Sequence, residues 1–302
     1  MAIDKMQQFY RKFRPTFKGK FSSDVITTAF HIDERVIEIL KEIEVTNMQI
    51  TLDGTEKTHN TIKFTDGCDN PFQKVISNID LLAEKFPELH IVVRVNITKK
   101  NATEYVELNN FIVNRYQGKN IYISPSIVMN RTNDETMCDL FNHSEFSKFS
   151  FDLWQNNRIV SAWLMYKDKV HPECAIRSKS AIAIDPEGYA YQCWENIGNK
   201  KYTIGKLDKN GNLTEINQKV LNRNLYGADP LGDKQCQKCS YLPMCGGGCS
   251  FQRIENEFEG AHNEVCTTYK NYISEWLTTY LELKKLGYFS KPEEKKSDEV
   301  LS

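Results

Sequence analysis

The sequence predicts an α/β protein with a parallel sheet in its first half, followed by a small cysteine-rich domain of hairpins and loops and a C-terminal helix. Two observations predict this class. Apolar strand-like runs alternate with amphipathic segments as far as about residue 130, which is typical of a parallel sheet with crossover helices. Beyond that point, all but two of the 9 cysteines fall between Cys174 and Cys266.

The first half alternates strands and helices in regular order. The clearest helix covers 33–45, where apolar residues recur at helical spacing. A later helix begins at Asn70, which suits the N-cap, with Pro71 at the first helical position. The expected helices are 1–14, 33–45, the segment from Asn70, and 102–115, and the expected strands are 24–28, 47–52, 89–97 and 120–129.

Hairpins are expected around the cysteines of the second half. Asp185-Pro186-Glu187-Gly188 suits a type I turn, with proline at the second position and glycine at the fourth, so a hairpin would deliver Cys193. Asn210-Gly211 predicts a second hairpin within 201–216. The remaining expected elements are a helix over 144–167, a final helix over 267–286 and a disordered tail from Lys291.

Composition limits the partners of the chain. Its 302 residues are enough for about two domains. A net charge of -1 argues against a nucleic-acid partner, and no apolar run is long enough to cross a membrane. We expect a cytoplasmic protein, because thiols stay reduced there. The expected divisions are 1–130 for the sheet, 131–170 for a linker and helix, 171–270 for the cysteine-rich domain, and 271–302 for the last helix and tail.

The spacing of the cysteines predicts a site for a metal or an iron-sulfur cluster. They follow the pattern C-x13-G-x4-C, then C-x2-C-x5-C-x3-C, then a last C. A C-x2-C turn places two sulfurs on one side of a tight loop. The run Gly246-Gly247-Gly248 lets the backbone adopt positive φ and approach a bulky group. Structural zinc would leave thiols over, and disulfides suit short secreted chains, so we favour iron-sulfur.

These motifs resemble the SPASM domain of radical SAM (S-adenosylmethionine) enzymes. The resemblance covers 174–266 and includes Gly188-x4-Cys193 and the text Tyr241-Leu242-Pro243-Met244-Cys245-Gly246-Gly247-Gly248-Cys249. It implies two auxiliary 4Fe-4S clusters. Two sets of ligands are implied, Cys174, Cys193 and Cys249 for the first cluster and Cys236, Cys239, Cys245 and Cys266 for the second.

The first implied cluster has only three thiolates in this chain. Some relatives supply a fourth cysteine just upstream, where this sequence has Lys169-Val170-His171-Pro172-Glu173. The fourth position would then be open to substrate or filled by His171, a carboxylate or water. An ordinary loop histidine remains the simpler interpretation of His171.

The first half resembles the later part of a radical SAM barrel. By this resemblance Thr51, Arg94 and Asn96 would help to bind S-adenosylmethionine. An equally good interpretation is that Thr51 and Asn96 cap strands while Arg94 pairs with a carboxylate. Lys63 stands where related loops often carry an arginine. The matching text is Gln49-Ile50-Thr51-Leu52-Asp53-Gly54, His59, Asp66-Gly67, Phe72 and Arg94-Val95-Asn96.

The sequence departs from that family at the front of the barrel. It contains neither the C-x3-C-x2-C loop of the radical-initiating cluster nor the Gly-Gly-Glu-Pro segment. We therefore expect a partial, incomplete radical SAM barrel, similar to a TIM barrel, with an unpaired edge at Asp24. This chain alone would not cleave S-adenosylmethionine. The cofactor would bind only if another chain supplied the N-terminal half.

The leading hypothesis is the C-terminal portion of a radical SAM/SPASM maturase that modifies a ribosomal peptide or a protein. Sulfatase-maturing relatives commonly carry an aspartate after the cysteine of the G-x4-C element, where this chain has Trp194. That departure favours a maturase that crosslinks peptides, although Trp194 is equally suited to packing over the cluster. The alternatives are a noncatalytic iron-sulfur protein that binds peptide or relays electrons, and a degenerate remnant.

Overall fold

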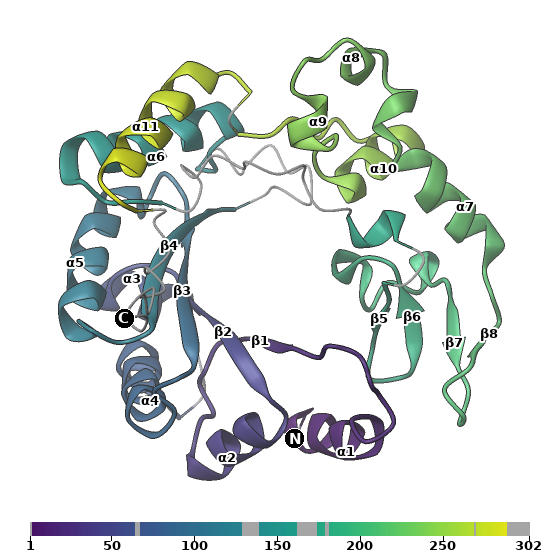
Figure 1. Ribbon diagram of the computed structural model, residues 1–302, viewed down its shortest axis with the longest axis horizontal. Helices are drawn as coiled ribbons and strands as arrows, with labels where there is room; N and C mark the ends of the chain where they lie inside the picture. Colours follow the sequence, from purple (N-terminus) through teal and green to yellow (C-terminus); the bar gives the residue numbers. More distant parts are fainter. Residues whose placement is uncertain are drawn as a thin grey trace, which may run out of the picture. The chain divides into compact units, whose positions relative to one another are not determined.

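The protein, described here by a computed structural model, consists of two compact units (Figure 1). The first unit comprises Met1–Phe141 and Asp152–Ala162, and the second comprises Asn142–Phe151 and Trp163–Ser302. The structure describes residues 2–63, 67–128, 139–161, 174–178, 181–268 and 270–288. Asp66, His171 and the tail from Lys291, all named from the sequence, lie outside these residues, as does Cys138, one of the two cysteines before Cys174.

A four-stranded parallel sheet organises the first unit, in the order β1-β2-β3-β4 (Figure 1). The strands are β1 (Ser23–Thr27), β2 (Val45–Leu52), β3 (His90–Ile97) and β4 (Ile121–Ile127). The helices are α1 (Ala2–Phe13), α2 (Glu34–Glu42), α3 (Glu56–Ile62), α4 (Pro71–Lys85) and α5 (Tyr105–Arg115). All four predicted strands are present, and the predicted α/β class is confirmed.

The two faces of this sheet differ in polarity. Side chains of β3 alternate between buried and half-buried along the whole strand. On one face, Val93 and Val95 of β3 are fully buried between β2 and β4. On the other face, Arg94 and Asn96 are half-buried and polar. Because neighbouring parallel strands are in register, polar side chains of β2 and β4 share that face.

Helix α2 begins as predicted and ends earlier. Its N-cap, Asp33, accepts a hydrogen bond from the backbone N–H of Val36 at 2.7 Å. The helix ends at Glu42 instead of residue 45, because Glu44 adopts a left-handed φ of 55° that helical backbone does not allow. Helix α4 confirms the Asn70 cap, since Asn70 Oδ1 accepts from the backbone N–H of Gln73.

Both predicted hairpins are found in the second unit, as an antiparallel sheet ordered β5-β6-β7-β8. In the first turn, the backbone N–H of Gly188 donates to the carbonyl of Asp185 at 3.0 Å, and Gly188 has a φ of 85°. The strands are β5 (Ala183–Ile184), β6 (Tyr189–Tyr191), β7 (Gly205–Leu207) and β8 (Leu213–Thr214).

Several helices of the second unit were not predicted, and two differ from prediction. Helix α6 ends at Asn157, well before residue 167. Helix α11 starts at Ile273 instead of residue 267, because the preceding backbone bonds to α6: Ser147 Oγ donates to the carbonyl of Thr268. None of the described helices has the length and apolar character needed to cross a membrane. The helices are α6 (His143–Asn157), whose residues from Asp152 belong to the first unit, α7 (Gln218–Gly227), α8 (Lys234–Gln237), α9 (Leu242–Cys245), α10 (Ser250–Phe258) and α11 (Ile273–Lys285).

Candidate functional site

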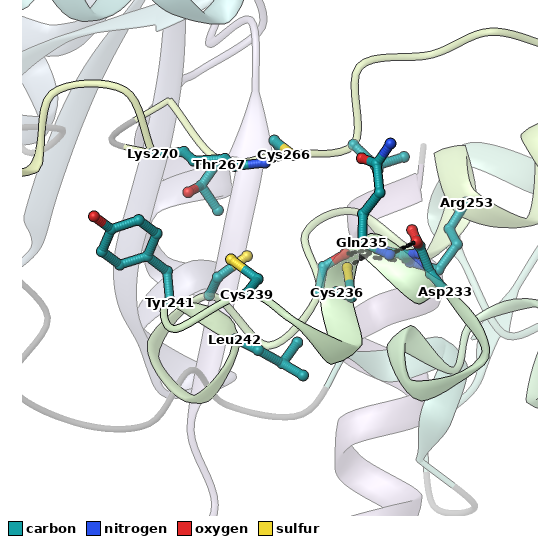
Figure 2. Close-up of a pocket in the computed structure, with 13 residues that line it drawn as sticks. Asp233, Gln235, Cys236, Cys239, Tyr241, Leu242, Arg253, Cys266, Thr267 and Lys270 are labelled. Carbon is teal, nitrogen blue, oxygen red and sulfur yellow. Dashed lines mark hydrogen bonds and ion pairs between the residues drawn. The ribbon is translucent and has the colours of Figure 1, made fainter.

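Four cysteines converge on one pocket of the second unit (Figure 2). We call them the second thiol group: Cys236, Cys239, Cys245 and Cys266. Cys236 lies in α8, and a turn in which the Cys239 N–H donates to the Cys236 carbonyl at 3.0 Å sets the first pair. Cys245 ends α9, and Cys266 lies on the extended segment before α11. The structure therefore brings together the cysteines that the resemblance assigned to one cluster.

The glycine run between Cys245 and Cys249 makes this pocket possible. Gly246, Gly247 and Gly248 have φ values of 64°, 90° and 73°, which L side chains rarely adopt. A Cβ on Gly248 would lie only 1.7 Å from the carbonyl oxygen of Val265. The loop can approach the segment that carries Cys266 only because this position has no side chain.

Arg253 of α10 donates to a thiol of this group. Its Nη2 lies 3.1 Å from Cys236 Sγ and 2.7 Å from the carbonyl of Gly247. Its Nη1 donates to Asp233 Oδ2 at 2.8 Å, and the residue is only 8% exposed. Burial raises the pKa of the Cys236 thiol, and the guanidinium partly opposes that shift. The same guanidinium holds the pKa of the Asp233 carboxyl below its usual value.

Lys270 supplies a second charged donor. Its Nζ lies 3.3 Å from Cys266 Sγ, and that contact raises the pKa of the lysine. The charges of Cys239 and Cys236 add to the shift. Figure 2 shows Lys270 on one side of these cysteines, with Arg253 and Asp233 on the other.

The remaining three cysteines form the first thiol group: Cys174, Cys193 and Cys249. Cys174 and Cys193 both pack against a small apolar cluster that includes Ile176 and Ile254. Burial raises the pKa of the Cys193 thiol to about 11, and the charges of Cys174 and Cys249 contribute to that shift. Arg177 links the two groups, since its Nη2 donates to the carbonyl of Gly246 at 3.0 Å.

The donor set suits a cluster better than a single ion. All eight described cysteines are free thiols. Within the described ranges, no three His, Cys, Asp or Glu side chains lie close enough to hold one metal ion. In a tetrahedral zinc site the thiolates would be about 3.8 Å apart, given a Zn–S distance of about 2.3 Å. A 4Fe-4S cube binds each thiolate through a different iron, so it fits thiols spread around a pocket.

The three residues predicted to contact S-adenosylmethionine share the polar face of the first sheet. Thr51 of β2 pairs with Arg94 of β3 in the strand register. Arg94 Nε donates to Asn96 Oδ1 at 3.1 Å, and Asn96 Nδ2 donates to Asp53 Oδ1 at 2.9 Å. The structure thus joins Arg94 and Asn96 in one hydrogen-bond chain that ends on a carboxylate.

Asp53, which the sequence analysis named only within the text that resembles the barrel, is the buried end of that chain. It is 5% exposed, and Lys63 Nζ lies 3.4 Å from its Oδ2. Its backbone N–H donates to Nδ1 of His59 at 3.2 Å, and Asn101 Nδ2 donates to its carbonyl at 2.7 Å. Burial lowers the pKa of His59, which keeps this imidazole neutral. The signal for Asp53 was its place directly after β2, at the carboxyl end of the sheet.

Trp194, next to Cys193, is 72% exposed. Packing of this indole over a bound cluster stays a prediction. An exposed indole beside a thiol group is also available to a ligand.

Comparison with curated proteins identifies relatives of one kind, although no protein-family model matches the chain. The chain is 22% identical to a cysteine-type anaerobic sulfatase-maturating enzyme of Clostridium novyi, over 94% of this chain and 78% of that enzyme. It is 25% identical to a serine-type anaerobic sulfatase-maturating enzyme of Klebsiella aerogenes, over 39% of this chain and 28% of that enzyme.

Solved structures share the fold. The structure of anSMEcpe with bound AdoMet matches with a TM-score of 0.64 at 16% identity, over 95% of this chain and 80% of that one. SuiB of Streptococcus suis, bound to the precursor peptide SuiA, matches with a TM-score of 0.52 at 13% identity, over 80% of this chain and 58% of that one. The sequence and structure matches confirm the predicted resemblance: the chain is similar to radical SAM peptide maturases.

Proposed function

We propose that this chain is the C-terminal portion of a radical SAM/SPASM maturase that modifies a ribosomal peptide or a protein. One observation carries the proposal: the second thiol group converges on a single pocket, next to a glycine loop that a side chain would block. Nothing in an ordinary core requires four free thiols there. The relatives' names support peptide or protein modification as the activity.

Two auxiliary 4Fe-4S clusters are part of this proposal. The second thiol group would supply four ligands to one cluster, and the first thiol group would supply three ligands to the other. When bound, such clusters store an electron or bind substrate at an open iron. The chain's own residues set their surroundings: Arg253 and Lys270 donate to thiol sulfurs, and Gly248 permits the close packing.

S-adenosylmethionine would bind on the polar face of the sheet, with Thr51, Arg94 and Asn96 as contacts. The AdoMet bound to anSMEcpe, which shares the fold, supports S-adenosylmethionine as the ligand. We further propose that residues 1–130 form a partial radical SAM barrel, that 131–170 form a linker and helix, and that 171–270 form the SPASM domain, with the last helix and tail at 271–302. A companion chain that carries the N-terminal half of the barrel, with its C-x3-C-x2-C loop, would complete the barrel at the β1 edge. We propose that the protein assembles in the cytoplasm.

A peptide substrate agrees with the exposed surface beside the first thiol group. SuiB binds a precursor peptide, and Trp194 offers an exposed aromatic ring next to Cys193. The curated relatives are sulfatase-maturating enzymes, whereas Trp194 stands where that subfamily commonly carries an aspartate. We therefore propose peptide modification as the activity and favour crosslink formation as the bond made.

One observation favours a second candidate, a noncatalytic iron-sulfur protein that relays electrons or binds peptide. The 302 residues contain no C-x3-C-x2-C motif, so the thiols described above are not those that initiate radical chemistry. Charged donors beside the second thiol group would suit electron storage in either candidate. Both candidates require the clusters, so cluster content is tested first.

The test is iron and sulfide content after anaerobic reconstitution of the full chain. We expect about eight irons per chain, about four in Cys239→Ala, and about eight in the control Cys68→Ala, whose cysteine lies in the first unit. Mixed with S-adenosylmethionine and reductant, the same sample releases no 5′-deoxyadenosine above background. Zinc in place of iron, or equal loss in both variants, would exclude the cluster assignment.

A further inference from the structure

Two cationic side chains reach sulfurs of the second thiol group from different elements. We propose that Arg253 and Lys270 are positioning residues that raise the reduction potential of the cluster held by this group. This inference rests on the proposed function, because it requires that a cluster binds there. It concerns a property that the cysteines alone do not determine.

Arg253 is fixed in place by its other hydrogen bonds. Asp233 accepts from Nη1 at 2.8 Å, and the carbonyl of Gly247 accepts from Nη2 at 2.7 Å and from Nε at 3.3 Å. A second hydrogen on Nη2 remains for Cys236 Sγ at 3.1 Å. Since the guanidinium is planar and the residue is 8% exposed, it cannot turn this donor toward solvent.

Lys270 is placed by the chain next to a different sulfur. It follows Cys266 by four residues, and its Nζ lies 3.3 Å from Cys266 Sγ. Its side chain lines the same pocket as the four thiols. The sulfurs of Cys236 and Cys266 therefore each receive one charged donor, from residues in α10 and in the segment before α11.

The charge of the cluster gives the direction of the effect. An oxidised 4Fe-4S cube of charge 2+ with four thiolates carries a total of 2−. Reduction adds one electron to the irons, breaks no bond and moves no proton, so the total becomes 3−. A nearby cation stabilises the more negative state more strongly, and hydrogen bonds to the sulfurs act in the same direction. Both donors therefore favour the reduced cluster.

Asp233 makes the effects of Arg253 and Lys270 on the reduction potential unequal. Its carboxylate lies against the Arg253 guanidinium and offsets most of that positive charge at a distance. Lys270 therefore supplies the net positive charge at the site, while Arg253 mainly supplies a directed hydrogen bond. Removing the charge of Lys270 should lower the potential, and removing the charge of Asp233 should raise it.

The experiment measures the reduction of the second cluster alone. A Cys193→Ala background removes a ligand of the other cluster and leaves about four irons per chain. EPR then follows the reduced cluster while the solution potential is varied. In this background we expect Lys270→Gln to lower the ratio of reduced to oxidised cluster about tenfold at a fixed potential, which is about 59 mV for one electron.

Two further variants separate charge from structure. Lys238→Gln removes the same charge from an exposed position between Cys236 and Cys239, and should change the ratio less than about twofold. Asp233→Asn removes the carboxylate charge but keeps an oxygen that can cap α8 at the N–H of Gln235, because asparagine also caps helices, and should raise the ratio. A merely structural role for these residues would not produce shifts of opposite sign.

The readouts distinguish two failures. If the Cys193→Ala protein binds no iron, the proposed function fails. If it binds about four irons and Lys270→Gln leaves the potential unchanged, or if Asp233→Asn lowers it, the inference is wrong while the proposed function stands. Arg253→Lys keeps the positive charge with fewer donors, and should lower the ratio less than Lys270→Gln does.

Discussion

In the first unit, buried apolar side chains run continuously along the sheet. In the second unit, two of the apolar clusters have only three buried residues each. Strands β2 and β3 place Ile50, Ile91 and Val93 at 1% exposure or less. The second unit has one cluster around Ile176 and Ile254 and another formed by Ala190 of β6, Ile204 before β7 and Val220 of α7. Small cores stabilise weakly, so we expect the second unit to gain stability from the proposed clusters, as small metal domains do.

The largest effect expected from this difference comes from Gly248→Ala. The new methyl group would meet the carbonyl of Val265 at 1.7 Å, which forces Cys266 away from the other thiols. We expect iron content after reconstitution to fall from about eight to about four per chain. The amides of the sheet in the first unit should keep their protection against hydrogen exchange.

Gly260→Ala is the matched control for this change. Gly260 also has a positive φ, of 69°, yet a Cβ there would meet nothing within 4 Å. It therefore introduces the same backbone strain without the clash, and should keep about eight irons. Equal iron loss in both variants would show that strain alone, and not the close approach, governs the pocket.

The first unit was predictable because its signals are local and repeated. Apolar residues at helical spacing predicted α2, and Asn70 with Pro71 predicted the start of α4. The short helices α3 and α7 to α10 were missed because each has at most 10 residues and tertiary contacts hold it in place. Left-handed backbone at Glu44, which ends α2, has no sequence signal, since glutamate seldom adopts it.

The candidate site shows the same limit. The cysteine spacing predicted a cluster site, and the resemblance to the SPASM domain divided the thiols into two groups. Arg253 and Lys270 had no such signal, since each is one of 39 basic residues and only the fold brings it to a sulfur. The sequence likewise named Asp53 only within the text that resembles the barrel, and Lys63 only as a substituted position. The contact between them became evident only in the structure.

A smaller effect is expected from a change in the core of the first unit, which should destabilise the sheet without changing the iron content. Ile50 is fully buried in β2, so Ile50→Ala should lower the local free energy of unfolding of the sheet by about 2–5 kcal/mol. Hydrogen exchange of β3 amides measures this change. Ile26→Ala in β1 removes the same atoms from a side chain that is 69% exposed, and should cost less than about 0.5 kcal/mol. Iron content should remain about eight in both; a loss of iron in Ile50→Ala would mean that the sheet supports the thiol groups.

The smallest effect concerns pH and His59. Burial lowers the pKa of this imidazole below its ordinary value of 6.5, with the nearby Lys63 charge adding to the shift and Asp53 opposing it. Below about pH 6.5 the unfolded chain therefore binds a proton that the folded chain does not, and the free energy of unfolding decreases as pH falls toward the folded pKa. Above pH 6.5 both states are neutral at this residue, so it adds no pH dependence.

His59→Gln tests this origin, because glutamine keeps an acceptor for the backbone N–H of Asp53 but does not titrate. Exchange of β2 and β3 amides between pH 5 and pH 8 should show a decrease in stability at low pH for the unaltered chain and a flatter profile for His59→Gln. His262→Gln, which changes an exposed histidine of the second unit, should keep the original profile. If His59→Gln also kept the original pH profile, protonation of another group would govern the acid sensitivity of the sheet. The stabilities of the sheet and of the second unit would then have to be compared near neutral pH alone.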